Sequence, residues 1–265
     1  MRPSRGILVT GGGTFLGDNI AAALLALGAK VSLLARPGTE DKLGPLTQQT
    51  RWSTADVWNP ASLRGKARFH SAVIHTVGSL TADPARGLSL HWLNFVSARN
   101  VANMCVSDGV RRMILLSSAN APWISRDYIR AKREAEDYIR RMGLSASIIR
   151  APLLYAPGHR RPLFYRALSL LGVLPPLSWS YLGRIAPMSA DAFARGIAQI
   201  AIAADDDKAI HYARDLRRLS RRGAASPITG RGDSLTTAEA ESLGAYAILD
   251  EDLPFGWSPS DEPPN

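Results

Sequence analysis

Residues 6–30, GILVTGGGTFLGDNIAAALLALGAK, decide the fold. They begin with an apolar run of strand length at residues 6–10, pass through a turn of three glycines, and continue with apolar residues at helical spacing over residues 16–27. Glycines let the backbone turn tightly and approach a diphosphate, while the amino end of a helix offers N–H groups and the positive end of its dipole. The order of strand, glycine turn and helix therefore predicts a site for the diphosphate of a dinucleotide.

The alternation of strand and helix patterns continues beyond this unit. Further apolar strands are predicted at residues 30–35, 71–77, 112–116 and 145–150, and helices at residues 88–107 and 127–142. Strands that are apolar almost throughout and are separated by helices belong to a parallel sheet that is covered on both faces. We therefore expect an α/β fold, namely a Rossmann-type doubly wound parallel sheet.

The pattern weakens after Pro152, where we expect a small C-terminal substrate or lid region. Within it the sequence predicts helices at residues 162–172 and 190–204, and a loop bearing proline and tryptophan at residues 174–181. From about residue 221 onward the chain is rich in glycine, serine, proline and charge, which is typical of a flexible tail. The expected organisation is one nucleotide-binding domain over residues 1–220, lid region included, and a tail over residues 221–265.

Charge is distributed unevenly along the 265 residues. The tail is acidic from Asp233 onward, with eight carboxylates and no lysine or arginine, whereas residues 1–232 carry a net charge of +17. A basic body attracts phosphorylated cofactors, anionic lipid or nucleic acid. The excess positive charge of residues 1–232 comes mostly from arginines, and these are not gathered into runs interleaved with aromatic residues. We therefore expect no nucleic-acid partner.

Cys105 is the single cysteine, which excludes an internal disulfide and a cysteine-built metal site. We expect a buried thiol, no metal, and a reducing cytoplasmic compartment. No apolar run reaches the roughly 18 residues that a membrane-spanning helix needs, and the amino terminus lacks the pattern of a signal peptide. The apolar stretch at residues 171–181, flanked by arginines, leaves a peripheral association with a membrane open.

The second predicted strand is followed directly by Arg36. NAD-binding folds usually place an acidic residue there to bind the ribose 2′-hydroxyl, whereas arginine accommodates a 2′-phosphate. We therefore expect NADP(H) as the preferred cofactor and NAD(H) as the alternative. A solvated side chain on an arginine-rich surface is the competing interpretation of Arg36.

Tyr128 and Lys132 stand four residues apart on a predicted helix, so their side chains lie on one helical face. A tyrosine hydroxyl is a poor acid or base near neutrality, and a nearby ammonium group lowers its pKa. Ser118 follows the preceding strand, at the carboxyl edge where open α/β sheets bind ligands. We expect Ser118 to polarise a substrate carbonyl or hydroxyl, Tyr128 to exchange the proton, and Lys132 to support Tyr128.

The segment TGGGTFLG, from Thr10 to Gly17, resembles the T-G-x-x-G-x-x-G loop of the extended and atypical short-chain dehydrogenases/reductases, with Thr14 at the place of the middle glycine. The resemblance covers roughly residues 6–219. Residues 128–158 look especially like the branch that contains the nucleotide-binding accessory subunit of respiratory complex I.

The resemblance implies roles for further residues. Asn94 is the structural asparagine of the central helix, and His75 is a strand-end histidine without a catalytic role. The Thr14 hydroxyl offers a donor to a phosphate. The cofactor-binding residues are Gly11, Gly13, Thr14, Phe15 and Leu16 at the diphosphate, Arg36, Asp56 and Val57 at the adenosine, Thr76 and Val77 along the dinucleotide, and Lys132, Pro152 and Leu153 at the nicotinamide.

Two functions follow from these expectations. The first is an NADP(H)-dependent oxidoreductase or epimerase-like enzyme that acts on the carbonyl or secondary alcohol of a small, apolar substrate. The second is a non-catalytic NAD(P)H-binding accessory or redox-sensing protein of quinone or respiratory metabolism, associated with a membrane or a respiratory complex. The two long helices at residues 88–107 and 127–142 also suit a homodimer.

Overall fold

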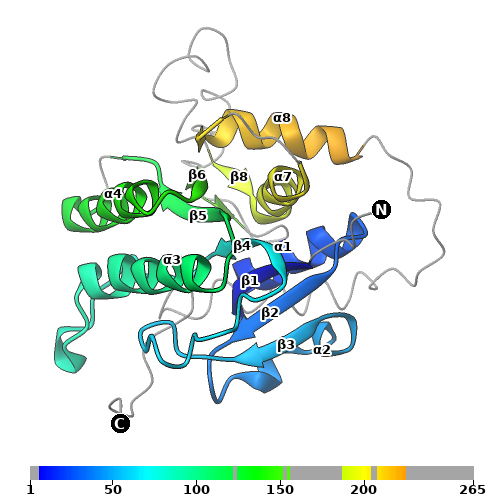
Figure 1. The fold of residues 1–265 in the computed structure, drawn as a ribbon. Coiled ribbons are helices and arrows are strands. Elements are labelled where there is room, and N and C mark those ends of the chain that lie inside the picture. Colours follow the sequence, from blue (N-terminus) through cyan, green and yellow to red (C-terminus); the bar gives the residue numbers. More distant parts are fainter. Residues whose placement is uncertain (1–5, 122–123, 152–153, 156–186, 204–207, 225–265) are drawn as a thin grey trace, which may run out of the picture.

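A computed structural model of the chain describes residues 6–121, 124–151, 154–155, 187–203 and 208–224. Within these ranges seven parallel strands form one sheet in the order β3-β2-β1-β4-β5-β6-β9 (Figure 1). The strands are β1 (Gly6–Gly12), β2 (Val31–Ala35), β3 (Arg51–Thr54), β4 (His70–His75), β5 (Arg112–Ser118), β6 (Ser145–Ala151) and β9 (Ile210–His211). The strand order reverses between β1 and β4, and such a switch point is where open α/β sheets bind ligands.

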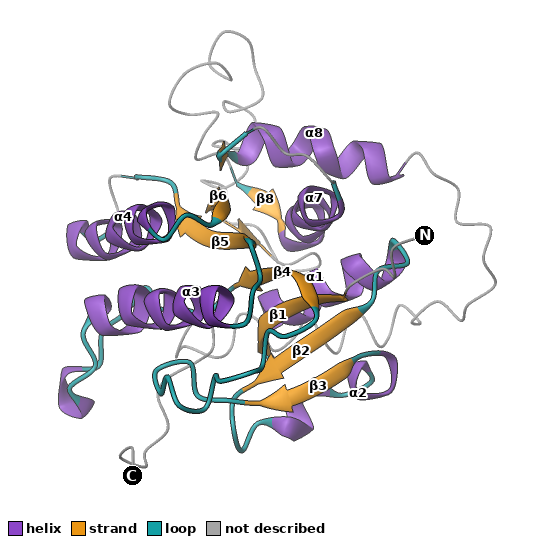
Figure 2. Cartoon of the chain, in the orientation of Figure 1, coloured by secondary structure: helices purple, strands orange, loops and turns teal. Residues whose placement is uncertain are grey.

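Helices cover both faces of the sheet (Figure 2). One face carries α1 (Phe15–Ala26), α7 (Ala190–Ile202) and α8 (Ala213–Ala224), and the other carries α3 (Ser97–Ser107) and α4 (Arg126–Arg141). Smaller elements are α2 (Leu46–Gln49), the 3₁₀ turns Glu40–Leu43 and Pro84–Arg86, the π-helical turn Trp92–Val96, and the paired short strands β7 (Leu154–Tyr155) and β8 (Met188–Ser189). No helix in the described part of the chain is long and apolar enough to span a bilayer.

Two layers of buried side chains hold the helices on the sheet. In β1, Leu8 packs into the layer under α3 and α4, while Ile7 and Val9 pack into the layer under α1 and α7. All three side chains are buried. Because both faces of each central strand are covered, the strands are apolar at consecutive positions instead of alternating with polar residues.

The structure confirms the predicted fold class. The strands expected at residues 30–35, 71–77, 112–116 and 145–150 correspond to β2, β4, β5 and β6. Sequence analysis misses β3, an edge strand whose Arg51 and Trp52 are exposed, and β9, which has only two residues. Neither segment carries the continuous apolar pattern from which a buried strand is predicted.

Three expectations need correction or lie outside the structure. The predicted helix at residues 88–107 is interrupted by the π-helical turn, where Asn94 and Ser97 donate to the carbonyls of Leu90 and Leu93, one turn earlier. The tail boundary predicted at about residue 221 falls within α8, which continues to Ala224. The helix predicted at residues 162–172, the apolar and loop segment at 171–181, and residues 225–265 lie outside the described ranges.

Phe193 offers a test of the packing beneath α7. Its side chain is fully buried against the α1 layer, so Phe193→Ala is expected to lower the free energy of unfolding by about 3–5 kcal/mol. Ile202→Ala on the same helix is the matched control, because Ile202 is 44% exposed, and its effect is expected to stay below about 1 kcal/mol. Equal losses in the two variants, measured by urea unfolding, would contradict this arrangement.

Candidate active site

The glycine turn is shaped by two positive φ angles and two close approaches. Gly11 and Gly13 have φ values of +86° and +78°, which side chains rarely tolerate. A Cβ on Gly11 would lie 2.3 Å from the Thr76 hydroxyl oxygen, and one on Gly17 would lie 2.2 Å from the Gly11 carbonyl oxygen. The turn therefore requires glycine at these three positions, and it leads directly into the amino end of α1, the kind of junction that holds a diphosphate.

Thr14 fits the turn without being glycine. Its backbone is extended, with φ −112° and ψ 148°, so the family's middle glycine is not needed for conformation here. The Thr14 hydroxyl donates to the Gly11 carbonyl at 2.7 Å and accepts from the Gly17 N–H at 3.2 Å, which makes Thr14 the N-cap of α1. The expectation that this hydroxyl is a phosphate donor is therefore wrong for this state, whereas the helix start leaves the N–H groups of Phe15 and Leu16 for an anion.

Sequence analysis does not single out Asp18, which lies in the first turn of α1. Its carboxylate accepts a hydrogen bond from the Gly13 N–H at 2.9 Å, and the residue is only 8% exposed. Burial raises the pKa of Asp18 to about 7, and the Gly13 hydrogen bond offsets only part of that rise. The sequence shows an acidic residue just after the glycine turn, but it does not show that this side chain is buried.

The residues predicted at the adenosine end follow the neighbouring strands β2 and β3. Arg36 comes directly after β2, is half-buried, and its carbonyl accepts from the N–H and hydroxyl of Thr39. Asp56 follows β3 and accepts from the Trp58 N–H at 2.9 Å. Val57 is buried, and its carbonyl accepts from the Asn100 side chain at 3.1 Å. The sheet thus brings these positions to one edge, beside the glycine turn.

Thr76 and Val77 follow β4 at the same edge. The Thr76 hydroxyl donates to the Thr10 carbonyl at 2.6 Å, and both residues are buried. The remaining two predicted cofactor residues, Pro152 and Leu153, lie outside the described ranges.

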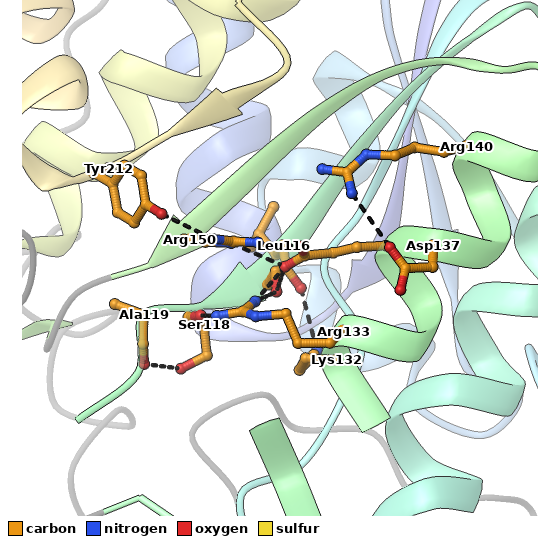
Figure 3. Close-up of polar contacts among 11 residues, drawn as sticks. Leu116, Ser118, Ala119, Lys132, Arg133, Asp137, Arg140, Arg150 and Tyr212 are labelled. Atoms are coloured by element: carbon orange, nitrogen blue, oxygen red, sulfur yellow. Dashed lines mark hydrogen bonds and ion pairs between the residues drawn. The ribbon is translucent and has the colours of Figure 1, made fainter. Parts of the chain in front are cut away.

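Ser118, Tyr128 and Lys132 converge at the carboxyl end of β5. Tyr128 is 2% exposed, and its hydroxyl interacts with the Ser118 side chain. The Ser118 hydroxyl also donates to the Ala119 carbonyl at 3.0 Å (Figure 3). The Lys132 ammonium donates to the Leu116 carbonyl at 3.1 Å and lies 5.6 Å from the centroid of the Tyr128 ring.

The electrostatics of Tyr128 differ from the expectation. Complete burial raises the pKa of the phenol above its usual range, and the Ser118 hydrogen bond and the charge of Arg133 offset only part of the rise. Burial also lowers the pKa of Lys132 to about 8, against the opposing charge of Glu136. The expectation that the ammonium brings the phenol below its usual pKa is therefore wrong for this state, because the phenolate would be buried away from water.

Glu136, which the sequence patterns did not single out, holds the carboxyl ends of β5 and β6 together. Its carboxylate is 1% exposed, pairs with Arg133, and accepts from the Ser117 hydroxyl at 2.5 Å and from Arg150 at 2.7 Å. Burial alone raises the pKa of Glu136, but the hydrogen bonds of Arg150 and Ser117 and the charge of Arg133 outweigh it and bring the pKa below its ordinary value.

The two arginines extend this cluster in opposite directions. Arg133 donates to the Ser118 carbonyl at 2.9 Å, and Arg150 donates to the Tyr212 hydroxyl at 2.8 Å. The cluster thus connects the candidate active site with the segment that precedes α8. The signal in the sequence was the position of Glu136, one helical turn after Lys132 on the same face of α4.

Asn94 and His75 complete the surroundings of Lys132. The Asn94 side chain donates to the Ser79 carbonyl at 2.8 Å and accepts from the Ser79 N–H at 3.1 Å, as suits a structural residue. A Cβ on Gly78 would lie 2.5 Å from the Asn94 side-chain oxygen and 2.8 Å from the Lys132 nitrogen. His75 is fully buried against the Thr10 hydroxyl, and burial together with the charge of Lys132 lowers its pKa to about 3, so it is neutral near pH 7.

Comparison with known proteins agrees with this geometry. A family model described as NAD(P)H-binding matches residues 11–165, more than half of the chain. The chain belongs to this NAD(P)H-binding family. This membership agrees with the resemblance to the atypical short-chain dehydrogenases/reductases that the sequence indicates. A kinship with the complex I branch stays a prediction.

Relatives of this family member are known by sequence and by structure. A protein named ceramide reductase from Caulobacter vibrioides is 32% identical over 181 residues, which are 66% of this chain and 55% of the relative's length. The chain thus spans little more than half of that relative. A dTDP-glucose 4,6-dehydratase from Streptomyces venezuelae, solved with NAD, is 20% identical with a TM-score of 0.55 over 82% of this chain and 79% of that one. A short-chain dehydrogenase/reductase from Veillonella parvula, solved with NADP, is 17% identical with a TM-score of 0.54 over 76% and 88%.

Removal of the buried carboxylate tests the cluster around Glu136. Glu136→Ala leaves two arginines next to one another without their shared partner, so we expect a loss of about 3–5 kcal/mol in the free energy of unfolding. Glu134→Ala on the same helix is the control, because the exposed pair of Glu134 with His91 contributes about 1 kcal/mol or less. Chemical unfolding of both variants measures the difference, and similar losses would refute a structural role for the cluster.

Proposed function

We propose that this protein is an NADP(H)-dependent oxidoreductase that reduces the carbonyl group of an apolar substrate to a secondary alcohol. The observation that carries the proposal is the convergence of Ser118, Tyr128 and Lys132 at the edge of the sheet that also holds the glycine turn. The turn fits a dinucleotide, because Gly11 and Gly13 adopt positive φ angles and Gly17 lets the start of α1 pack against the Gly11 carbonyl, at a junction of strand and helix. A bound nicotinamide supplies the hydride in such a reaction.

Ser118 and Tyr128 have separate roles in the proposed reduction. The Ser118 hydroxyl holds and polarises the substrate carbonyl oxygen, and the Tyr128 hydroxyl gives its proton to that oxygen as the hydride reaches the carbonyl carbon. Burial keeps the Tyr128 phenol protonated, since its pKa lies above the usual range, and this favours its role as the acid in a reduction. The phenolate that remains is stabilised by the Ser118 hydrogen bond and the charges of Arg133 and Lys132 until it regains a proton from solvent.

A substrate with long alkyl chains is favoured by the relative named ceramide reductase. Ceramide carries a secondary hydroxyl group on a long alkyl chain, and such an alcohol is the product when hydride from a nicotinamide and a proton reduce a ketone at that carbon. A panel of ketones and secondary alcohols with alkyl chains of increasing length, ceramide-type amides included, tests this assignment. A rise of kcat/KM with chain length is expected, and turnover restricted to sugar nucleotides would overturn the apolar substrate class.

Tyr128→Phe tests the mechanism. Loss of the proton donor is expected to lower kcat by about 10²–10⁴-fold, while the dissociation constant of NADPH stays within about twofold. Tyr138→Phe is the matched control on the same helix, because the Tyr138 hydroxyl donates to Asn103 of α3, and this variant is expected to leave kcat unchanged. Undiminished turnover by Tyr128→Phe would rule out the proposed acid.

Arg36→Ala tests the cofactor preference. Loss of a charge-assisted contact to a 2′-phosphate is expected to weaken NADPH binding about tenfold or more, with NADH binding nearly unchanged. Fluorescence titration of both cofactors measures the ratio. Equal weakening of the two would show that Arg36 does not distinguish them, and NAD(H) would then be the cofactor to prefer.

A second candidate is a cofactor-binding accessory or redox-sensing protein without turnover. The observation that favours it is the complete burial of Tyr128, whose hydroxyl is already engaged by Ser118. Tight binding of NADPH without turnover of any compound in the panel would support this candidate over the enzyme.

A further inference from the structure

The first turn of α1 holds an acidic group at the place where a diphosphate binds. Asp18 is the fourth residue after the N-cap Thr14, is 8% exposed, and accepts from the Gly13 N–H at 2.9 Å. The N–H groups of Phe15 and Leu16, which start the helix, belong to the same turn. A carboxylate and a diphosphate here would share one small, water-poor region.

No cation compensates for this carboxylate within the described ranges. Asp18 takes part in no ion pair there, and it is the single ionisable residue of α1. Of the elements around it, β1, β2 and α2 carry no ionisable side chain. The charged groups on the other neighbouring segments are Arg36 after β2, Glu40, Asp41 and Lys42 of the 3₁₀ turn, and the mutually paired Asp191 and Arg195 of α7.

We propose that Asp18 takes up a proton when the dinucleotide binds, and that this residue therefore limits cofactor affinity at neutral and alkaline pH. The inference rests on the proposed cofactor site. An ionised Asp18 and a diphosphate bound at the same turn repel one another, and poor solvation strengthens that repulsion. A neutral carboxyl removes the repulsion and can still accept from the Gly13 N–H with its carbonyl oxygen.

The sign of the pH dependence follows from linkage. Burial has already brought the pKa of Asp18 to about 7, so half of the molecules carry the charge at that pH. The negative diphosphate raises this pKa further, so binding is tighter in acid and weaker in base. A further rise of about one unit on binding would increase the dissociation constant about fivefold between pH 6 and pH 8.

Calorimetric titration of the full chain with NADH tests the proposal, because NADH lacks a 2′-phosphate that itself titrates near pH 6. Titration at pH 7 in two buffers of different ionisation enthalpy gives the number of protons taken up per NADH. We expect a fraction of one proton for the wild type and a clearly smaller uptake for Asp18→Asn, in which Lys132, with a pKa of about 8, still responds to the charge of the cofactor. The variant is also expected to bind NADH more tightly at pH 8, with a dissociation constant that changes less between pH 6 and pH 8 than that of the wild type.

Asp41→Asn is the matched control, since Asp41 is an exposed carboxylate on a neighbouring segment. It is expected to retain the proton uptake and the pH dependence of the wild type. Thermal unfolding checks the Asp18 variant independently. Because the pKa of Asp18 is raised from its ordinary 3.8 to about 7 in the folded chain, stability falls as pH rises from about 4 to about 7 and stays low above that, so Asp18→Asn is expected to gain more in Tm at pH 8 than at pH 5.

Several results would overturn the proposal. They are an absence of proton uptake by the wild type, an unchanged pH dependence in Asp18→Asn, or weaker binding of NADH by that variant at pH 8. Failure of the wild type to bind NADH and NADPH at every pH would reject the proposed cofactor site itself. Binding of NADH without proton uptake would instead reject only the role of Asp18, so the two failures can be distinguished.

Discussion

The arrangement of the site depends on the ion pairs and hydrogen bonds of the buried Glu136 carboxylate. It lies at the carboxyl ends of β5 and β6, where the strands stop and their last residues must be held by side chains instead of by further strand pairing. Arg133 and Arg150 neutralise it, and Ser117 adds a hydrogen bond. Each partner belongs to a different part of the structure, so a single buried charge fixes α4, the end of β5 and the end of β6 relative to one another. Such a group is costly to bury and is tolerated only when all its partners are present.

The position of Ser118 follows from this constraint. Arg133 donates to the Ser118 carbonyl, so the main chain at the end of β5 is held from α4, the helix that also carries Tyr128 and Lys132. The serine and the tyrosine are thus placed by one rigid unit and not by two independent loops. Precision of this kind matters, since proton transfer requires heavy atoms within hydrogen-bond reach.

The sequence predicted most of the sheet and of the site, because both depend on local patterns. Apolar runs followed by glycine or hydroxyl residues mark the ends of strands, and the four-residue spacing of Tyr128 and Lys132 places both on one helical face. The missing parts depend on long-range burial. Glu136 and Asp18 look like ordinary surface acids in the sequence, and only the fold shows that one is neutralised by two arginines while the other has no cationic partner in the described residues. The pKa of Tyr128 was mispredicted for the same reason, since spacing shows a nearby ammonium but not the loss of water.

Burial also gives the site a common electrostatic character. His75 is neutral near pH 7, Tyr128 is protonated, and Lys132 and Asp18 have pKa values of about 8 and 7, close enough to neutrality for small changes to alter their charge. A cofactor that brings two or more negative charges stabilises the protonated forms of both Lys132 and Asp18. The Lys132 ammonium then supports the Tyr128 phenol, and the neutral Asp18 carboxyl no longer repels the diphosphate. The negative charge of the cofactor therefore changes the protonation of groups at both ends of the site. Asp18 links pH to cofactor binding, and Lys132 links pH to proton transfer.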